Sequence, residues 1–143
     1  MVDVTGKPEV LREAVARGLI RLKSETLELI RTESVEKGDV SGVARVAGVL
    51  AAKNTSGLIP LCHPLPLTNA KVDLRVVEGV GVECVVTVRT RAQTGVEMEA
   101  LVGVAVALLT VWDMVKQYEK DERGQYPSTV VEDVRVVSKV KGK

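Results

Sequence analysis

The sequence predicts an α+β fold in which helices cover one face of an antiparallel sheet. Apolar residues alternate with polar ones over residues 72–76 and again over 82–88, which is the period of strands with one buried face. Residues 78–81 (Glu-Gly-Val-Gly) predict the turn of a hairpin between these strands. Apolar residues recur instead at helical spacing over 40–54, and they surround the predicted helix completely over 100–109. Strands and helices of these kinds pack as a sheet with helices on one face.

Composition and charge limit the class of protein. The 143 residues are enough for one domain, residues 1–143, with a single core. Apolar residues make up 45% of the chain but Phe is absent, so the core must be aliphatic. The net charge of only +1 argues against nucleic acid and against an acidic membrane surface as partners. The scarcity of aromatic residues also argues against base stacking on single strands.

The chain carries no signal for secretion or for a membrane. Two cysteines supply no disulfide framework, and no secretory leader is apparent. The longest apolar stretch, residues 100–112, is too short to span a bilayer. We therefore expect a soluble, reduced, cytoplasmic protein.

The N-terminal part contains one ambiguous segment. Residues 1–8 are polar and predict a flexible arm. The composition of residues 10–22 favours a helix, but Gly18 interrupts it, and Ala14, Ala16, Gly18 and Ile20 also fit the two-residue period of a strand. If this segment is a strand, the order of elements becomes β-α-α-β-β-α-β. That order predicts a ferredoxin-like antiparallel sheet covered by helices on one face, with one added helix.

Two helices should follow in the next thirty residues. Ser24 is a candidate N-cap for a helix that runs through Ile30 and ends before Lys37. Asp39 can cap a second helix over 40–54. Glycines and alanines make this second helix thin, so that another backbone can approach it closely.

The C-terminal half predicts a long helix and a last strand. Thr94 and Glu97 have the spacing of a capping box at the start of a helix that runs to about Lys120. A charged loop over 121–128 separates this helix from a strand over 130–137. Residues 139–143 then form a basic tail.

A proline-rich segment, residues 58–67 (Leu-Ile-Pro-Leu-Cys-His-Pro-Leu-Pro-Leu), holds Cys62 and the only histidine, His63. Each proline fixes its own φ and restricts the residue before it, so the segment is stiff and can form neither a regular helix nor a central strand. It is either a buried connection between a helix and a strand or a rigid support for functional side chains. His63 could act as an acid or a base near neutral pH.

Other candidate functional residues lie on the predicted helices. Asp113 and Lys116 are three residues apart on one helix face and form a plausible acid–base couple. Acidic residues at 97 and 99 flank Met98 in a first helical turn, where the pattern alone favours a structural role. Lys37 and Lys53 flank the thin helix and could bind anions. One histidine and two cysteines are poor material for a zinc site.

The length of the last helix adds a constraint on any shared site. Asp113 follows Glu99 by 14 residues, and at 1.5 Å per residue the two lie roughly 21 Å apart along one helix. They cannot both contact one small substrate within the same chain. If both are functional, the site combines residues of two subunits in antiparallel array.

Several motifs occur in one order along the chain: residues 1–5 (Met-Val-Asp-Val-Thr), 37–39 (Lys-Gly-Asp), 58–65, 94–101 (Thr-Gly-Val-Glu-Met-Glu-Ala-Leu) and 113–116 (Asp-Met-Val-Lys). In these motifs the chain resembles the cyclic pyranopterin monophosphate synthases, also called molybdenum cofactor biosynthesis protein C. The resemblance runs from Met1 to about Lys120 and resumes weakly in the last strand.

The resemblance implies a lyase of molybdenum cofactor biosynthesis. Its substrate would be 3′,8-cyclo-7,8-dihydroguanosine 5′-triphosphate, and its products cyclic pyranopterin monophosphate and pyrophosphate. It implies a ferredoxin-like subunit in a homohexamer, a trimer of dimers, with active sites at the dimer interfaces. No cofactor held by the protein is expected, although Mg²⁺ can accompany the triphosphate.

The resemblance also implies roles for particular residues. The catalytic set falls on Asp113, Lys116 and Lys37. The substrate-binding set comprises Leu61, Cys62, His63, Met98, Glu99 and Lys53, to which we add Glu97 of the same helical turn. We expect Cys62 to be reduced and not nucleophilic.

Two segments depart from the resemblance, and two other functions stay open. Residues 118–130 are longer and more charged than expected, and a glycine-rich basic tail is reduced to residues 139–143. One alternative is a non-catalytic ferredoxin-like regulatory oligomer that binds nucleotides. The other is a purely structural assembly subunit.

Overall fold

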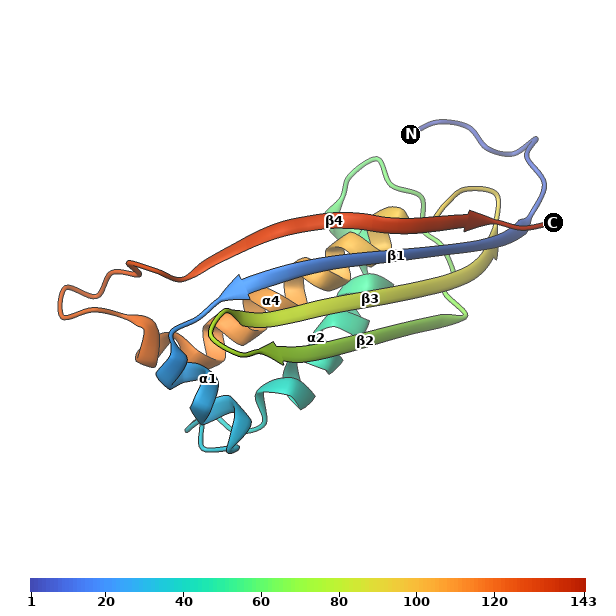
Figure 1. The fold of residues 1–143 in the computed structure, drawn as a ribbon. Coiled ribbons are helices and arrows are strands. Elements are labelled where there is room, and N and C mark those ends of the chain that lie inside the picture. Colours follow the sequence, from blue (N-terminus) through green and yellow to red (C-terminus); the bar gives the residue numbers. More distant parts are fainter.

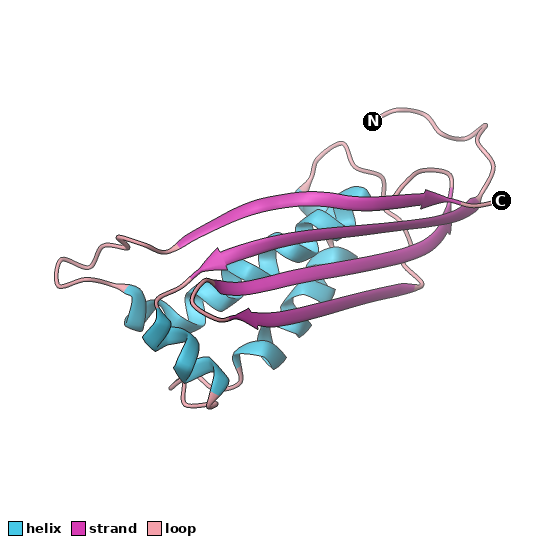
Figure 2. Ribbon diagram, viewed as in Figure 1, coloured by secondary structure: helices cyan, strands magenta, loops and turns pink.

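The computed structural model describes residues 1–143 as a four-stranded antiparallel sheet with helices on one face, as Figures 1 and 2 show. The strand order is β2-β3-β1-β4, and every neighbouring pair is antiparallel. Together with the order of elements, this confirms the predicted ferredoxin-like arrangement. The elements are β1 (Val10–Arg21), α1 (Ser24–Arg31), α2 (Val40–Lys53), α3 (Thr55–Leu58), β2 (Asn69–Val77), β3 (Gly81–Ala92), α4 (Glu97–Glu119) and β4 (Val130–Lys141).

The ambiguous N-terminal segment is the strand β1, which lies in the middle of the sheet. It pairs with β3 on one side and with β4 on the other, so its backbone groups are satisfied as a strand. Ala14, Ala16 and Ile20 are fully buried beneath the helices. A Cβ atom at Gly18 would lie 2.8 Å from Cγ1 of Val104 on α4. The glycine that argued against a helix therefore lets α4 pack closely on the strand.

The helix N-termini only partly follow the prediction. Asp39 caps α2 as expected, since its Oδ1 accepts from the backbone N–H of Gly42 at 3.0 Å. Ser24 is not an N-cap, because α1 begins at Ser24 itself after Lys23. The capping box from Thr94 is also wrong. The helix α4 begins at Glu97 after Val96, which leaves Thr94 outside the capping position.

The last strand is longer than predicted. β4 continues to Lys141 because it stays paired with β1, with Lys139 opposite Ala14 and Lys141 opposite Arg12. The prediction of a basic tail over 139–143 is therefore wrong for residues 139–141. Lys139 instead forms an ion pair with Glu97 at 2.9 Å and ties the edge strand to the start of α4.

The core is aliphatic and centres on α4, which packs on the sheet and against α2. By length and composition alone α4 could cross a membrane, but more than half of its apolar window is buried, as in the core helix of a soluble protein. Cys84 on β3 is fully buried, as predicted, and burial raises the pKa of its thiol to about 12. The thin helix α2 approaches α4 at Gly48, where a Cβ atom would lie 3.2 Å from the carbonyl oxygen of Gly103.

One buried carboxylate joins three elements where α4 ends. Glu119 is fully buried and accepts hydrogen bonds from the hydroxyls of Thr26 on α1 and Thr129 before β4, the latter at 2.7 Å. It also accepts from the backbone N–H of Lys23 at 3.1 Å. A buried carboxylate with several donors replaces a side-chain cap at the start of α1.

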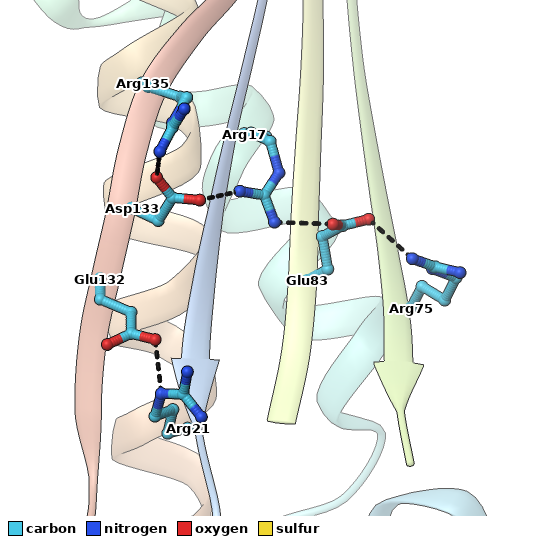
Figure 3. A network of polar contacts seen from close by, with 7 residues as sticks. All are labelled: Arg17, Arg21, Arg75, Glu83, Glu132, Asp133 and Arg135. Atoms are coloured by element: carbon cyan, nitrogen blue, oxygen red, sulfur yellow. Dashed lines mark hydrogen bonds and ion pairs between the residues drawn. The ribbon is translucent and has the colours of Figure 1, made fainter. Parts of the chain in front are cut away.

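A chain of charged side chains crosses the face of the sheet that has no helices (Figure 3). Asp133 on β4 binds both Arg135 and Arg17. Arg17 continues to Glu83 at 2.8 Å, and Glu83 accepts from Arg75 on β2 at 3.2 Å. Asp133 has a φ of 58° and lies where the register of β4 against β1 shifts, as in a β-bulge that turns a side chain towards one face.

Gly103→Val should destabilise the fold by about 1–3 kcal/mol, because overpacking forces neighbouring backbones apart. A Cβ atom there would already lie 3.2 Å from Cγ1 of Val86 and 3.3 Å from the carbonyl oxygen of Gly48. Urea unfolding followed by circular dichroism measures the change. Gly57→Ala is the control, since a Cβ atom at Gly57 meets nothing within 4 Å. Equal losses in both variants would contradict the importance of the close contact.

Candidate active site

The three residues predicted to be catalytic lie together at the C-terminal part of α4. Lys116 Nζ is 3.0 Å from Asp113 Oδ1, and Lys37 Nζ is 3.2 Å from Asp113 Oδ2. Lys37 also donates to the backbone carbonyl of Asp113 at 3.0 Å. The helix places Asp113 and Lys116 on one side, while Lys37 arrives on the connection between α1 and α2, which turns at Gly38 with a φ of 118°. We call these three residues the Asp113 cluster.

The charges of the Asp113 cluster follow from these contacts. Hydrogen bonds from Lys116 and then Lys37 hold the pKa of Asp113 below its ordinary value. The same carboxylate raises the pKa of Lys116. At neutral pH Asp113 is therefore ionised and Lys116 is protonated, so the cluster can neutralise anions and hold a proton on Lys116. The side chain of Asp113 is 60% exposed, so water has access to it in the single chain.

A second group of predicted residues lies at the other end of α4. Cys62 Sγ donates to Glu99 Oε2 at 3.8 Å, and Glu99 is only 3% exposed. The other carboxylate oxygen of Glu99, Oε1, is buried without a hydrogen-bond partner. We call this pair, with the flanking residues Leu61, His63 and Met98, the Glu99 cluster.

Burial governs the electrostatics of the Glu99 cluster. It raises the pKa of Glu99, because a carboxylate with few donors in an apolar surrounding favours its neutral form. Burial and the neighbouring Glu99 together raise the pKa of the Cys62 thiol. Cys62 is a free cysteine held as a thiol, which is the state expected of a residue that binds and does not attack.

His63, Leu61 and Met98 complete the Glu99 cluster, and Glu97 and Lys53 are the other predicted residues on this side of the molecule. His63 Nε2 lies 2.7 Å from the carbonyl oxygen of Val2. Leu61 is 72% exposed, and Met98 is 38% exposed. Glu97 is paired with Lys139 on the edge strand. Lys53 is the last residue of α2, which runs antiparallel to α4 and ends on this side of the helix layer (Figure 1).

The two clusters do not meet within one chain. Glu99 and Asp113 belong to one continuous helix, so the separation of roughly 21 Å calculated from the helical rise applies. The largest cavity, about 700 Å³, lies elsewhere, between α1 and the β2–β3 turn. None of the predicted residues line that cavity, and its lining offers no acid–base or thiol group beyond Glu28, Arg31 and Glu78.

Sequence reasoning missed two residues that contact the predicted site residues, and the chain offers no preformed metal site. Lys139 was assigned to a tail, although the alternation of residues 130–141 could have extended the strand to it. The contact of Val2 with His63 left no signal, because it joins backbone to side chain across 61 residues. No three His, Cys, Asp or Glu side chains lie close enough together to hold a metal ion.

Comparison with known proteins gives one consistent family. The model of the MoaC family matches residues 1–142. The chain is 55% identical over 141 residues to a probable cyclic pyranopterin monophosphate synthase of Sulfolobus acidocaldarius, covering 99% of this chain and 98% of the relative. It is 57% identical over 142 residues to proteins of the same name from Archaeoglobus fulgidus and Methanosarcina acetivorans, covering 99% of this chain and 90% and 89% of those relatives.

These matches extend over nearly the whole chain and include both clusters, and the relatives are named as enzymes. The non-catalytic alternatives are therefore not favoured. The resemblance predicted from the motifs is confirmed, and the chain belongs to the MoaC family.

Proposed function

We propose that this chain is a lyase of molybdenum cofactor biosynthesis, a cyclic pyranopterin monophosphate synthase. It converts 3′,8-cyclo-7,8-dihydroguanosine 5′-triphosphate to cyclic pyranopterin monophosphate and releases pyrophosphate. Relatives at 50–57% identity carry the name of this enzyme. The structural observation that carries the proposal is the pair of complementary clusters at the two ends of α4, one cationic and exposed and the other acidic and buried.

The proposed reaction opens a ring derived from a purine, builds a pyran and closes a cyclic phosphate, so it requires several positioned proton transfers. Lys116 can donate a proton and Asp113 can accept one, since they already share a hydrogen bond at 3.0 Å. Lys37, with Lys53 at the Glu99 end, supplies positive charge for the triphosphate and for the departing pyrophosphate. No cofactor held by the protein is needed, and Mg²⁺ can arrive with the triphosphate.

The Glu99 cluster supplies recognition of the base. Glu99 can accept from N–H groups of the guanine-derived ring, because its Oε1 has no other partner. His63 adds a hydrogen-bonding ring beside it. Leu61 and Met98 present exposed apolar surface at the same place, which a flat ring system can cover.

A complete site requires two chains. In a two-fold dimer with α4 helices antiparallel, the Asp113 cluster of one chain faces the Glu99 cluster of the other, and two identical sites form. Such pairing would also cover Asp113, whose proton transfers need protection from bulk water. We place the dimer in a hexamer built as a trimer of dimers. The two free cysteines fit a reducing, cytoplasmic location.

Asp113→Asn should lower turnover of the cyclised dihydro-GTP substrate by about 10²–10⁴-fold without unfolding the chain, because it removes a proton acceptor from an exposed position. Release of pyrophosphate measures the turnover. Asp73→Asn is a matched control, since Asp73 is also exposed and paired with a lysine, at 3.6 Å from Lys71. An Asp113→Asn variant with normal turnover would contradict the assignment.

Mixing two inactive variants tests the shared site. Asp113→Asn and Glu99→Ala chains, exchanged in equal amounts, should regain roughly a quarter of wild-type activity, because half of the dimers are mixed and one of their two sites is intact. The measurement is turnover after exchange of subunits, which differently tagged chains verify. Exchange without recovery would show that each site uses a single chain.

Glu99→Gln should raise the melting temperature by about 3–6 °C at pH 8 while abolishing turnover, because it removes a buried charge of the site. The pKa of Glu99 is raised above its ordinary value of 4.5 in the folded chain. The neutral carboxyl group therefore contributes stability to the fold that is fully present below pH 4.5. This contribution is lost as the pH rises through the folded-state value. The gain should therefore vanish at pH 4, and thermal unfolding at both pH values checks it. A gain that persists unchanged at pH 4 would exclude charge burial as its source.

A further inference from the structure

The residues before β1 contact His63 of the Glu99 cluster and are joined to other segments by two hydrogen bonds. We call residues 1–9 the N-terminal arm; Figure 1 shows it as the blue segment between the label N and the start of β1. The carbonyl oxygen of Val2 lies 2.7 Å from His63 Nε2. The carbonyl oxygen of Thr5 accepts from Gln93 Nε2, in the loop before α4, at 3.3 Å. The arm thus joins the proline-rich segment to the loop that leads into Glu97 and Glu99.

A short turn holds the arm in this shape. Asp3 Oδ1 accepts from the backbone N–H of Thr5 at 2.9 Å and from the Thr5 hydroxyl at 2.6 Å. These bonds close a turn over residues 3–5 and restrain the backbone directly after the Val2 carbonyl. They also hold the pKa of Asp3 below its ordinary value, so the turn persists at neutral pH.

The contact between Val2 and His63 determines where the histidine carries its proton. A backbone carbonyl can only accept a hydrogen bond, so Nε2 must be the donor. A neutral imidazole has one N–H group, and Nδ1 is then a bare acceptor. Without the arm, both tautomers of the ring would be available.

We propose that the N-terminal arm is a positioning element of the active site: the Val2 carbonyl fixes the tautomer of His63, so that Nδ1 is the atom offered to the substrate. This inference rests on the proposed function for the identity of the substrate. It assigns to His63 a partner that donates, such as an N–H group of the guanine-derived ring or a hydroxyl group. Asp3 acts through the turn and has no contact with the substrate.

Two substitutions at Asp3 test whether the turn is needed to hold the arm in place. Asp3→Ala removes the acceptor for Thr5 and releases the arm, whereas Asp3→Asn keeps a side-chain oxygen that can accept the same bonds. Glu9→Ala, farther along the arm, is the control for shortening an exposed acidic side chain. Both positions are exposed and lie outside the core, so the folded chain is retained.

The test uses the full chain labelled with ¹⁵N in histidine, whose ring signals belong to His63 because it is the only histidine. Without substrate, the wild-type, Asp3→Asn and Glu9→Ala chains should carry the proton on Nε2, and Asp3→Ala should populate both tautomers. In the conversion assay Asp3→Ala should lower kcat/KM about ten-fold, the loss of one charge-assisted or well-placed hydrogen bond. Asp3→Asn should recover most of this loss, and Glu9→Ala should show none.

A wild-type ring protonated on Nδ1, or the same tautomer ratio in all four proteins, would overturn the inference. The ring signals are read without substrate, so they test the arm even where no turnover occurs. A wild-type chain with the expected tautomer and no conversion of the cyclised substrate would contradict the proposed function and leave the role of the arm in place.

Discussion

The burial of α4 constrains where this chain can place its chemistry. The helix packs on the sheet with one side and on α2 with another, and the contact between Gly48 and Gly103 leaves no room for a polar side chain in between. Ionisable groups can therefore reach the surface of α4 only towards its two ends. Everything else in the site follows from this arrangement. The loops that meet each end, the one that carries Lys37 and the proline-rich segment, supply most of the other predicted site residues.

The two ends offer opposite environments to a substrate. At the Asp113 end, exposed charges are already paired, so an arriving anion competes with Asp113 for two lysines. At the Glu99 end, one oxygen of a buried carboxyl group has no hydrogen-bond partner, which is unfavourable for the free energy of the folded chain. A substrate group that donates a hydrogen bond to this oxygen removes that unfavourable contribution. A guanosine triphosphate derivative has an anionic tail and a ring rich in donors. The two environments thus fit the two halves of one molecule.

The fold was largely predictable because its signals are local. The hairpin, the helix α2 with its Asp39 cap and the long helix α4 each follow from periodicity and one or two punctuating residues. β1 stayed ambiguous because alanines and glycine suit either state, and only its pairing on both sides decides the question. The wrong cap at Ser24 has a physical cause. The N-terminus of α1 is satisfied by Glu119, 96 residues away from Lys23, and such a partner leaves no trace in nearby sequence.

Only part of the arrangement of the predicted site residues follows from the sequence. The spacing of Asp113 and Lys116 gives their contact directly, since helical geometry brings together residues three apart. The meeting of Cys62 with Glu99, and of Lys37 with Asp113, depends on how loops lie over the ends of α4. The arm was expected to be mobile because it is polar. Its bonds to His63 and Gln93 depend on side chains from other segments.

The charge chain across the outer face of the sheet has a consequence for temperature. Isolated surface ion pairs add little stability, but Asp133 and Glu83 each serve two arginines, so fixing one side chain helps to order its neighbours. The cost of removing water from charged groups falls on heating, while the stabilisation from apolar burial levels off. The core here is built from small aliphatic side chains. At temperatures close to unfolding, the ion pairs on the outer face of the sheet therefore contribute a larger share of the stability of the protein than they do at 25 °C.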